Sequence, residues 1–482
     1  MAEIEESYLE EGHEEKRKNK HEKLLPTSNI KTDFYLMSNG ARALSESVLS
    51  PFIPLFGQSL GASSPQIGFI TSITSLLSIF QIIWAVIAQK LKLTRFIAVI
   101  SYYVSTIFTF LLLPIKNIFA FAAMRGSQSI IISGMLPTSS SIMAERVSPK
   151  FYGLINSLLQ GVLVLGTAIG TIIGGAILWK LPIELSFTII FITSGIISIV
   201  AAVFFHISIP SKKRLEAKGR WQYVEEVDVG FSNALAIMKT DRNYVFYCIF
   251  NFIFISGVNL TGPFFIIFNT THYDLTIFET ALLSSIGLIP QVLASIVTTQ
   301  LTKKARKKEL AIVAGVFTSF FPIFYIIPSL SGKLTGVFWI LIIIWSANGI
   351  AWGIINSSMT TLLLDIIHPR RRTLQLAISN SISSLGLFLA PIIGGIIIDH
   401  SATIYLVLLI SAVIRFVGIS LFVFIKEPII GGTILRPLSR IIPVFIRSNA
   451  EKGVTIITAF TPKKIVQRIN QKKKEKEKQN NS

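Results

Sequence analysis

Four charged residues lie deep inside long apolar segments of this sequence: Arg42, Glu46, Arg125 and Arg415. A charge at the middle of a membrane-spanning helix costs about 2.5–3.5 kcal/mol on insertion scales, so such side chains rarely face lipid. A carboxylate in a cleft of low dielectric can take up and release a proton, whereas a guanidinium stays charged and pairs with anions. The chemistry that these residues could perform is therefore proton exchange at Glu46 and charge pairing at the arginines.

Glu46 belongs to a polar stripe with Asn39, Arg42 and Ser50, at spacings of three, four and four residues. These spacings place all four residues on one helix face, which needs water, substrate or polar partners opposite it. Two interpretations remain open. Arg42 and Glu46 neutralise each other as neighbours four residues apart, or Glu46 alternately holds a proton and pairs with Arg42 or Arg125, so that the arrival of substrate shifts the balance.

A second stripe consists of Arg125, Gln128 and Ser129. The Arg125 guanidinium does not titrate usefully, so we expect it to act as a counter-ion or as a ligand for an anion. Arg415 lies in the middle of the last apolar segment, where we expect a packing role or a position at the lipid edge.

Trp345, Asn348, Trp352 and Asn356 repeat the same spacing and predict an aromatic and amide helix face. Apolar packing of the two tryptophans is one explanation. Substrate binding is the other explanation, because the asparagine beside each tryptophan would be unfavourable if it faced lipid. A break at Gly262-Pro263 predicts a kink in an earlier segment.

The composition indicates an integral membrane protein. The chain has 482 residues, of which 51% are hydrophobic and 15% are charged, with a mean hydropathy of +0.62. A soluble domain has about 25% charged residues. The single cysteine, Cys248, excludes an internal disulfide, and the sequence has no metal-binding, phosphate-binding or nucleophile–base motif. We therefore expect no cofactor, no metal site and no enzymatic activity.

Twelve apolar segments are long enough to cross a bilayer as helices, since about 20 residues suffice. Uninterrupted runs of this length predict helices rather than the short alternating strands of a barrel. The predicted fold class is therefore all-α, with twelve transmembrane helices. The segments are 33–57, 66–89, 96–114, 117–144, 152–179, 184–209, 244–269, 276–301, 310–329, 335–364, 373–398 and 402–425.

The distribution of basic residues orients these helices. With the N-terminus placed inside, the short inside loops hold thirteen Lys and Arg and the outside loops hold three. This bias predicts cytoplasmic N- and C-termini in the cell membrane. The basic inside loops also account for much of the net charge of +19. We therefore expect no nucleic acid as a partner. We expect a disordered tail at 1–32, a cytoplasmic linker at 210–243 and a basic tail at 426–482, which is either solvated or bound to anionic lipid.

An internal repeat relates the two halves of the chain at an offset of 220 residues. The match runs without a gap and predicts two six-helix bundles, 33–209 and 244–425, related by a pseudo-twofold axis along the membrane normal. The aligned pairs include Glu145 and Asp365, Pro149 and Pro369, Gly166 and Gly386, Gly174 and Gly394, and Gly175 and Gly395.

Local motifs make the chain similar to the major facilitator superfamily from about residue 33 to residue 426. Arg125-Gly126-Ser127-Gln128 resembles the R-x-x-Q-G motif of the fourth helix. The glycines of the fifth helix resemble the antiporter motif G-x-x-x-G-P-x-x-G-G, with Thr171 in place of the proline. The resemblance implies a secondary transporter similar to drug/proton antiporters. It also implies that the stripes of the first and fourth helices face each other across a central cavity.

Two further groups of residues are expected to serve the transport cycle. Small residues let helices approach closely, either as static packing or as interfaces that re-pack between inward-open and outward-open states. Glu145 and Asp365 are expected to pair with basic loops and lock one gate state. The small-residue and proline positions are Gly166, Gly170, Gly174, Gly175, Gly386, Pro391, Gly394 and Gly395.

These features predict a monomeric transporter that works by alternating access and exports an amphipathic organic compound in exchange for protons. An importer or exchanger of organic anions, with Arg42 and Arg125 as ligands, is the alternative. A channel or a non-transporting membrane scaffold is a third possibility. Glu46 is the predicted proton carrier, and the predicted cavity residues are Asn39, Arg42, Arg125, Gln128, Trp345, Asn348, Trp352 and Asn356.

Overall fold

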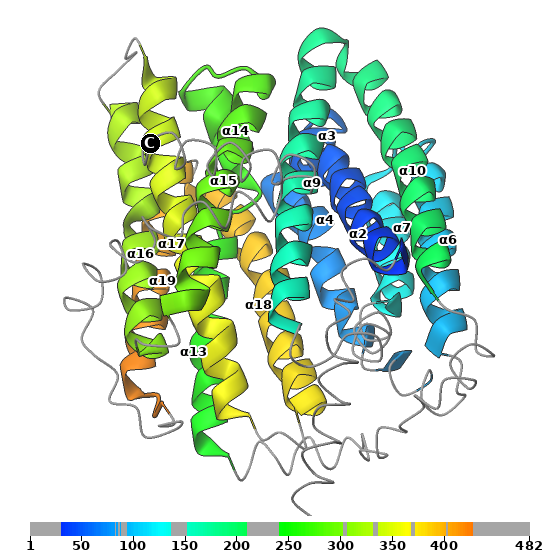
Figure 1. Ribbon diagram of the computed structural model, residues 1–482. Helices are drawn as coiled ribbons and strands as arrows, with labels where there is room; N and C mark the ends of the chain where they lie inside the picture. Colours follow the sequence, from blue (N-terminus) through cyan, green and yellow to red (C-terminus); the bar gives the residue numbers. More distant parts are fainter. Residues whose placement is uncertain are drawn as a thin grey trace, which may run out of the picture.

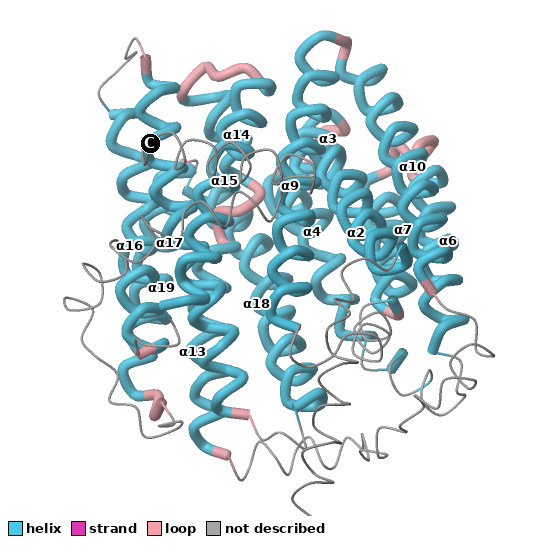
Figure 2. The backbone as a smooth tube through the Cα atoms, viewed as in Figure 1, coloured by secondary structure: helices cyan, strands magenta, loops and turns pink. Residues whose placement is uncertain are grey.

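The computed structural model describes ten stretches of the chain, and within them the chain is helical and contains no strand. Its helices run side by side as a bundle (Figures 1 and 2). Most of the predicted tails and linker lie outside the described residues, as does Glu145. The described residues are 30–81, 83–84, 87, 94–135, 152–209, 241–301, 306–330, 336–367, 372–401 and 403–427.

The first six predicted segments all contain helix. Prolines interrupt the first of them, because a proline lacks the N–H that continues a helix, and η2 has Pro51 in its first turn. The elements are α2 (Ile30–Leu49), η2 (Ser50–Phe52), α3 (Ile53–Ser59), α4 (Ser64–Leu77), η3 (Ser78–Phe80), α6 (Thr94–Leu111), α7 (Ile118–Ser133), α9 (Tyr152–Lys180) and α10 (Ile183–Ser208).

The last six segments are helical as well, so the all-α fold class is confirmed. The predicted kink is present, since the helix that ends at Asn259 resumes only at Phe264, after Gly262-Pro263. In the described part of the chain, eight helices are long and apolar enough to cross a membrane. The elements are α13 (Arg242–Asn259), α14 (Phe264–His272), α15 (Ile277–Leu301), α16 (Lys307–Leu330), α17 (Val337–Ile366), α18 (Arg372–Ser401), α19 (Ile404–Ser420) and η6 (Leu421–Phe424).

The internal repeat reappears in the packing. α9 and α18 are the helices that the 220-residue offset of the sequence aligns. α9 packs against α2 in its own half and against α15 in the other half, while α18 packs against α13 and α4 in the same way. The two helices with glycine faces therefore contribute both to the inside of a half and to the contact between halves.

Each half also has its own apolar core. In the first half the Phe56 ring packs against Phe121, Phe187 and Phe191, with centroid distances of 4.9, 4.9 and 5.7 Å. In the second half Cys248 is buried, 1% exposed, in a cluster of apolar and aromatic side chains. Cys248 is thus a small buried residue of the core, as free thiols commonly are.

Candidate functional site

A cavity of about 450 Å³ lies between the two halves. This volume is in the range of sites for small molecules, about 300–1,000 Å³. The first half contributes mainly hydroxyl groups, among them Thr71, Ser72 and Ser75 of α4. The second half contributes both aromatic rings and polar side chains, amides and one arginine among them, so aromatic and polar groups share its part of the wall.

The predicted stripe of α17 forms part of this wall. Trp345, Asn348 and Trp352 line the cavity, whereas Asn356 is exposed and does not. Trp345 also packs edge-on against the ring of Phe321, with centroids 5.3 Å apart. Both explanations of the stripe therefore apply to the same residues, since the rings pack on neighbours and also bound the cavity.

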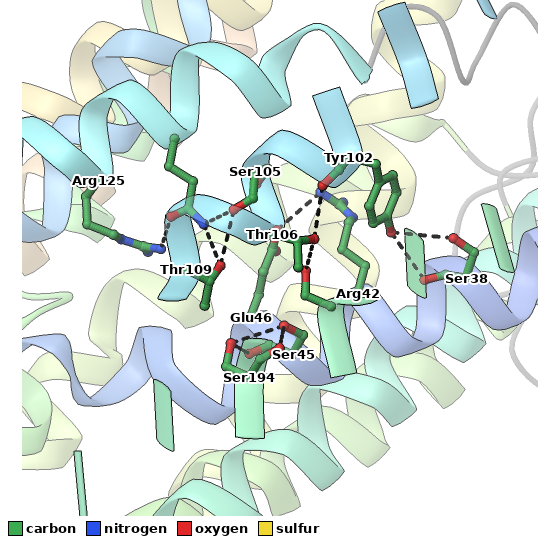
Figure 3. A network of polar contacts seen from close by, with 12 residues as sticks. Ser38, Arg42, Ser45, Glu46, Tyr102, Ser105, Thr106, Thr109, Arg125 and Ser194 are labelled. Carbon is green, nitrogen blue, oxygen red and sulfur yellow. Dashed lines mark hydrogen bonds and ion pairs between the residues drawn. The ribbon is translucent and has the colours of Figure 1, made fainter. Parts of the chain in front are cut away.

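Glu46 is paired with Arg42 and does not itself line the cavity. Arg42 Nη1 donates to Glu46 Oε1 at 3.3 Å, and the Glu46 side chain is 56% exposed while that of Arg42 is 20% exposed. Ser50, one helical turn further along the same stripe, lines the cavity. Figure 3 shows the Glu46 side chain between Arg42 and Arg125, and its charge acts electrostatically on both guanidinium groups.

Arg125 is oriented by Gln128 and does not line the cavity. Arg125 Nη1 donates to Gln128 Oε1 at 2.9 Å. Gln128 Nε2 in turn donates to the carbonyl oxygen of Ser105 at 3.0 Å and to Thr109 Oγ1 at 2.8 Å, both on α6. The structure thus places Gln128 between two helices, where it fixes the Arg125 side chain.

Asn39 also lies away from the cavity wall. Its Nδ2 donates to the carbonyl oxygen of Tyr35 at 2.8 Å, and the residue is 6% exposed. Of the polar stripe on the first helix, Ser50 touches the cavity, Glu46 lies one turn away, and Asn39 satisfies its amide within its own helix.

Arg415 lies at a place that the sequence did not predict. It is 2% exposed, which rules out the lipid edge, and it lines the cavity from α19. Its Nε donates to the carbonyl oxygen of Gly257 at 3.4 Å and its Nη2 to that of Val258 at 3.3 Å. The expected packing role is present, because these carbonyls belong to the turn that precedes the break between α13 and α14.

The glycine faces bring helices of the same half together. A Cβ atom on Gly166, Gly170 or Gly174 would lie 2.4 Å from a carbonyl oxygen of α2. In the second half, a Cβ on Gly394 would lie 2.2 Å from the carbonyl oxygen of Leu260, and one on Gly386 would lie 2.5 Å from a side chain of α13. α9 thus touches the backbone of α2, and α18 touches the backbone at Leu260, directly after α13, at distances that leave no room for a Cβ atom.

The adjacent glycines meet the opposite half instead. A Cβ atom on Gly175 would lie 2.3 Å from the Cβ of Ala281, and one on Gly395 would lie 2.4 Å from the carbonyl oxygen of Ser64. The carbonyl oxygen of Pro391 lies 2.3 Å from the Cβ position of Gly68. The two halves are therefore in contact at one end of the bundle through small residues on α9 and α18.

Asp365 forms an ion pair with Lys307, from the predicted basic loop. The pair joins the end of α17 to the start of α16 in the second half, and both side chains are largely buried, 15% and 19% exposed. Glu427 accepts the backbone N–H groups of Lys307 and Lys308 at 2.9 and 3.3 Å. A carboxylate at a helix N-terminus is stabilising, so this corner is held by several charged contacts.

The ion pair predicts a measurable coupling energy. Replacing Lys307 by Met or Asp365 by Asn is expected to cost about 1.5–3 kcal/mol, because hydrogen bonds between charged groups are worth about that much when partly buried. The double variant is expected to cost clearly less than the sum, as determined by a double-mutant cycle of unfolding in detergent.

The exposed pair Arg306–Glu309 is the matched control, with side chains 60% and 45% exposed. Its coupling is expected to be near zero, because solvent screens exposed pairs. Equal coupling in the two cycles would contradict a special role for the Lys307–Asp365 pair.

Solved structures similar to this chain are transporters. The nucleoside transporter NupG superposes with a TM-score of 0.62 at 17% identity, over 82% of this chain and 99% of that one. A POT family transporter in complex with 5-aminolevulinic acid gives 0.64 at 12% identity, over 82% and 96%. A bacterial homolog of the human lysosomal transporter Spinster, inward-facing and unoccupied, gives 0.57 at 15% identity, over 83% and 95%. At these identities the likeness establishes the fold alone.

No curated protein matches the sequence. The sequence profile of the Major Facilitator Superfamily, however, matches residues 36–332 and 247–461, which together span most of the chain. The twelve helical segments, the repeated halves and the cavity between them agree with that match. The chain belongs to the Major Facilitator Superfamily and is a multi-pass membrane transporter rather than an enzyme.

Proposed function

We propose that this protein is a proton-coupled secondary transporter that exports a small amphipathic organic compound by alternating access. The observation that supports the coupling is the position of Glu46, a carboxylate that is paired with Arg42 one helical turn from the cavity-lining Ser50 and whose charge also acts on the Arg125 guanidinium. Such a carboxyl group can alternate between a protonated state and an ionised state paired with a guanidinium as substrate enters or leaves the cavity. The aromatic and hydroxyl walls of the cavity suit an amphipathic solute.

The proposal includes the orientation of the protein. The protein lies in the cell membrane with both termini on the cytoplasmic side. The contacts of Gly175 and Gly395 with the opposite half then lie at the extracellular end of the helices. The described conformation is then closed outside. Separation of these contacts is the step that exposes the cavity to the outside, as alternating access of two repeats requires. We propose that the protein acts as a monomer.

Neutralising Glu46 is expected to uncouple transport. In proteoliposomes, a pH gradient is expected to accelerate flux of the substrate through the wild-type protein, and Glu46→Gln is expected to abolish that acceleration. Glutamine retains the shape and the hydrogen bonding to Arg42 but has no proton to exchange. The measurement is flux of a panel of organic solutes with and without the gradient.

Glu184→Gln is the matched control, since Glu184 is an exposed carboxylate in the first turn of α10. It is expected to leave the gradient response unchanged. Full gradient-driven flux in Glu46→Gln would remove Glu46 as the proton carrier.

A second candidate function is the import or exchange of organic anions bound by Arg42 and Arg125. Its support is that the Nε atoms of both arginines are buried and have no hydrogen-bond acceptor in the described part of the chain. Measurements of solute flux in proteoliposomes distinguish the two candidate functions. Uptake of anions and no flux of neutral or cationic compounds, with loss of the uptake in Arg125→Gln, supports the second.

A further inference from the structure

Arg415 differs from the other charged residues of the membrane interior because it lies in the cavity wall itself. Among the described residues that line the cavity, it is the one charged side chain. The ion pairs found in the described part of the chain do not include it. The cavity therefore has a positive charge on its wall, and no carboxylate lines it among the described residues.

The hydrogen bonds of Arg415 fix the guanidinium but leave its charge in place. In addition to the two carbonyls of α13, Nη2 donates to Thr261 Oγ1 at 3.1 Å and Nη1 to the carbonyl oxygen of Thr318 at 3.4 Å. All of these acceptors are neutral. They use four of the five guanidinium N–H groups, so one Nη1 N–H has no acceptor among the described residues.

Burial makes this charge costly without a partner. An ionised group that is 2% exposed loses most of its hydration, and neutral acceptors replace only part of it. A negative group in the cavity would supply the missing charge, at a place where water is scarce and electrostatic attraction is strong. The position of Arg415 thus favours an anion over a neutral or cationic ligand.

A second polar group on the wall also lacks a partner. Asn348 is 6% exposed, lines the cavity, and its Oδ1 is buried with no hydrogen-bond donor in the described part of the chain. An unsatisfied buried acceptor favours a ligand that brings an N–H or O–H group. The same wall contains the aromatic rings of Trp345, Trp352 and Phe265, which suit a flat apolar body.

We propose that the cavity binds an aromatic organic acid, with its carboxylate at Arg415 and a hydrogen-bond donor of the ligand at Asn348. This inference rests on the proposed transport function and deepens it by naming the charge and chemical class of the solute. It differs from the second candidate function in the arginine involved, because Arg42 and Arg125 do not line the cavity.

The test compares acids with their neutral amides on the purified full-length protein. The probes are para-hydroxybenzoate, para-hydroxyphenylacetate and para-hydroxyphenylpropanoate, each beside its amide, together with benzoate. Binding is measured by calorimetry, outside any transport assay. At least one acid of the panel is expected to bind about tenfold more tightly than its amide, since a charge-assisted hydrogen bond is worth more than about 1.4 kcal/mol.

Four variants locate the site. Arg415→Gln, which still donates to the carbonyls, is expected to reduce the preference for the acid to about onefold, and Arg415→Lys is expected to retain part of it. Arg125→Gln is expected to leave the preference unchanged. Asn348→Leu is expected to remove the advantage of the hydroxylated acid over benzoate while the preference for acid over amide remains.

Thermal unfolding shows which variants fold. If the Arg415 variants do not fold, Ser284→Asp tests whether the cavity prefers an anionic ligand. Ser284 also lines the cavity, and an added carboxylate there should weaken binding of the acid. No preference for any acid in the wild-type protein overturns the proposal, as does loss of the preference in Arg125→Gln but not in Arg415→Gln. Acid binding without flux in proteoliposomes would contradict the transport function alone.

Discussion

Gly170→Ala is expected to lower the melting temperature of the protein by about 2–12 °C. The new Cβ would lie 2.4 Å from the carbonyl oxygen of Leu44 and 3.0 Å from Ser47 Cβ, so α9 and α2 would have to move apart. Overpacking of this kind costs about 1–3 kcal/mol, and a domain of 150–250 residues loses about 2–4 °C per kcal/mol. The measurement is thermal unfolding in detergent.

Gly161→Ala is the matched control in the same helix, since no atom of the described residues lies within 4 Å of a Cβ at that position. Alanine is the better helix former by about 1 kcal/mol. The control is therefore expected to melt at the wild-type temperature or slightly above it. A common melting temperature for the two variants would show that α2 and α9 do not depend on a backbone-to-backbone contact.

Gly175→Ala combined with Gly395→Ala is expected to separate the halves at one end of the bundle. The two new methyl groups clash with Ala281 and with the carbonyl oxygen of Ser64, both in the opposite half. The contacts of α9 with α2 and of α18 with α13 are made by other glycines, so each half should remain folded. A clash of about 1–3 kcal/mol shifts a two-state equilibrium by about 5- to 150-fold.

Spin labels report this shift. Ser63 and His400 are exposed and lie near the Ser64–Gly395 contact, so cysteines at these two positions place one label on each half. Pulsed electron paramagnetic resonance should show a single short distance in the wild-type background and a longer distance as the main population in the double alanine variant. An unchanged distance distribution would mean that these glycines do not control separation of the halves.

The fold could be predicted because its two strongest signals, the length of the apolar segments and the internal repeat, can be read directly from the sequence. Apolar length alone locates membrane helices, and all twelve predicted segments contain helix. The 220-residue repeat predicted that α9 and α18 correspond, and both pack against one helix of their own half and one of the other half. The glycine spacing predicted close helix packing, but spacing shows which residues share a face and not which neighbour they meet. The division between glycines inside a half and those between halves required the structure.

The site was predictable in part. Trp345, Asn348 and Trp352 line the cavity as their stripe suggested. Gln128 shares a face with Arg125, yet it bonds to α6, because a polar side chain on a membrane helix is satisfied as well by a neighbouring helix as by a substrate. The hydroxyl residues of α4 could not be recognised as cavity residues from the sequence, since serine and threonine are common in membrane helices.

Arg415 was the main surprise of the site. A helix break at Gly262-Pro263 was visible in the sequence, and it implied carbonyl groups without backbone partners. Those carbonyls needed a donor, and the mid-helix arginine is that donor. The pairing joins residues about 160 positions apart, so it becomes apparent only once α13 and α19 are seen side by side.

The burial of the single cysteine has a practical consequence. Thiol reagents need a solvent-accessible thiolate, and the Cys248 side chain is 1% exposed within the core of the second half. The wild-type sequence is therefore a ready background for fluorescent and paramagnetic probes. Engineered cysteines on the loops should react alone, so signals from the working transporter can be assigned without replacing a core residue.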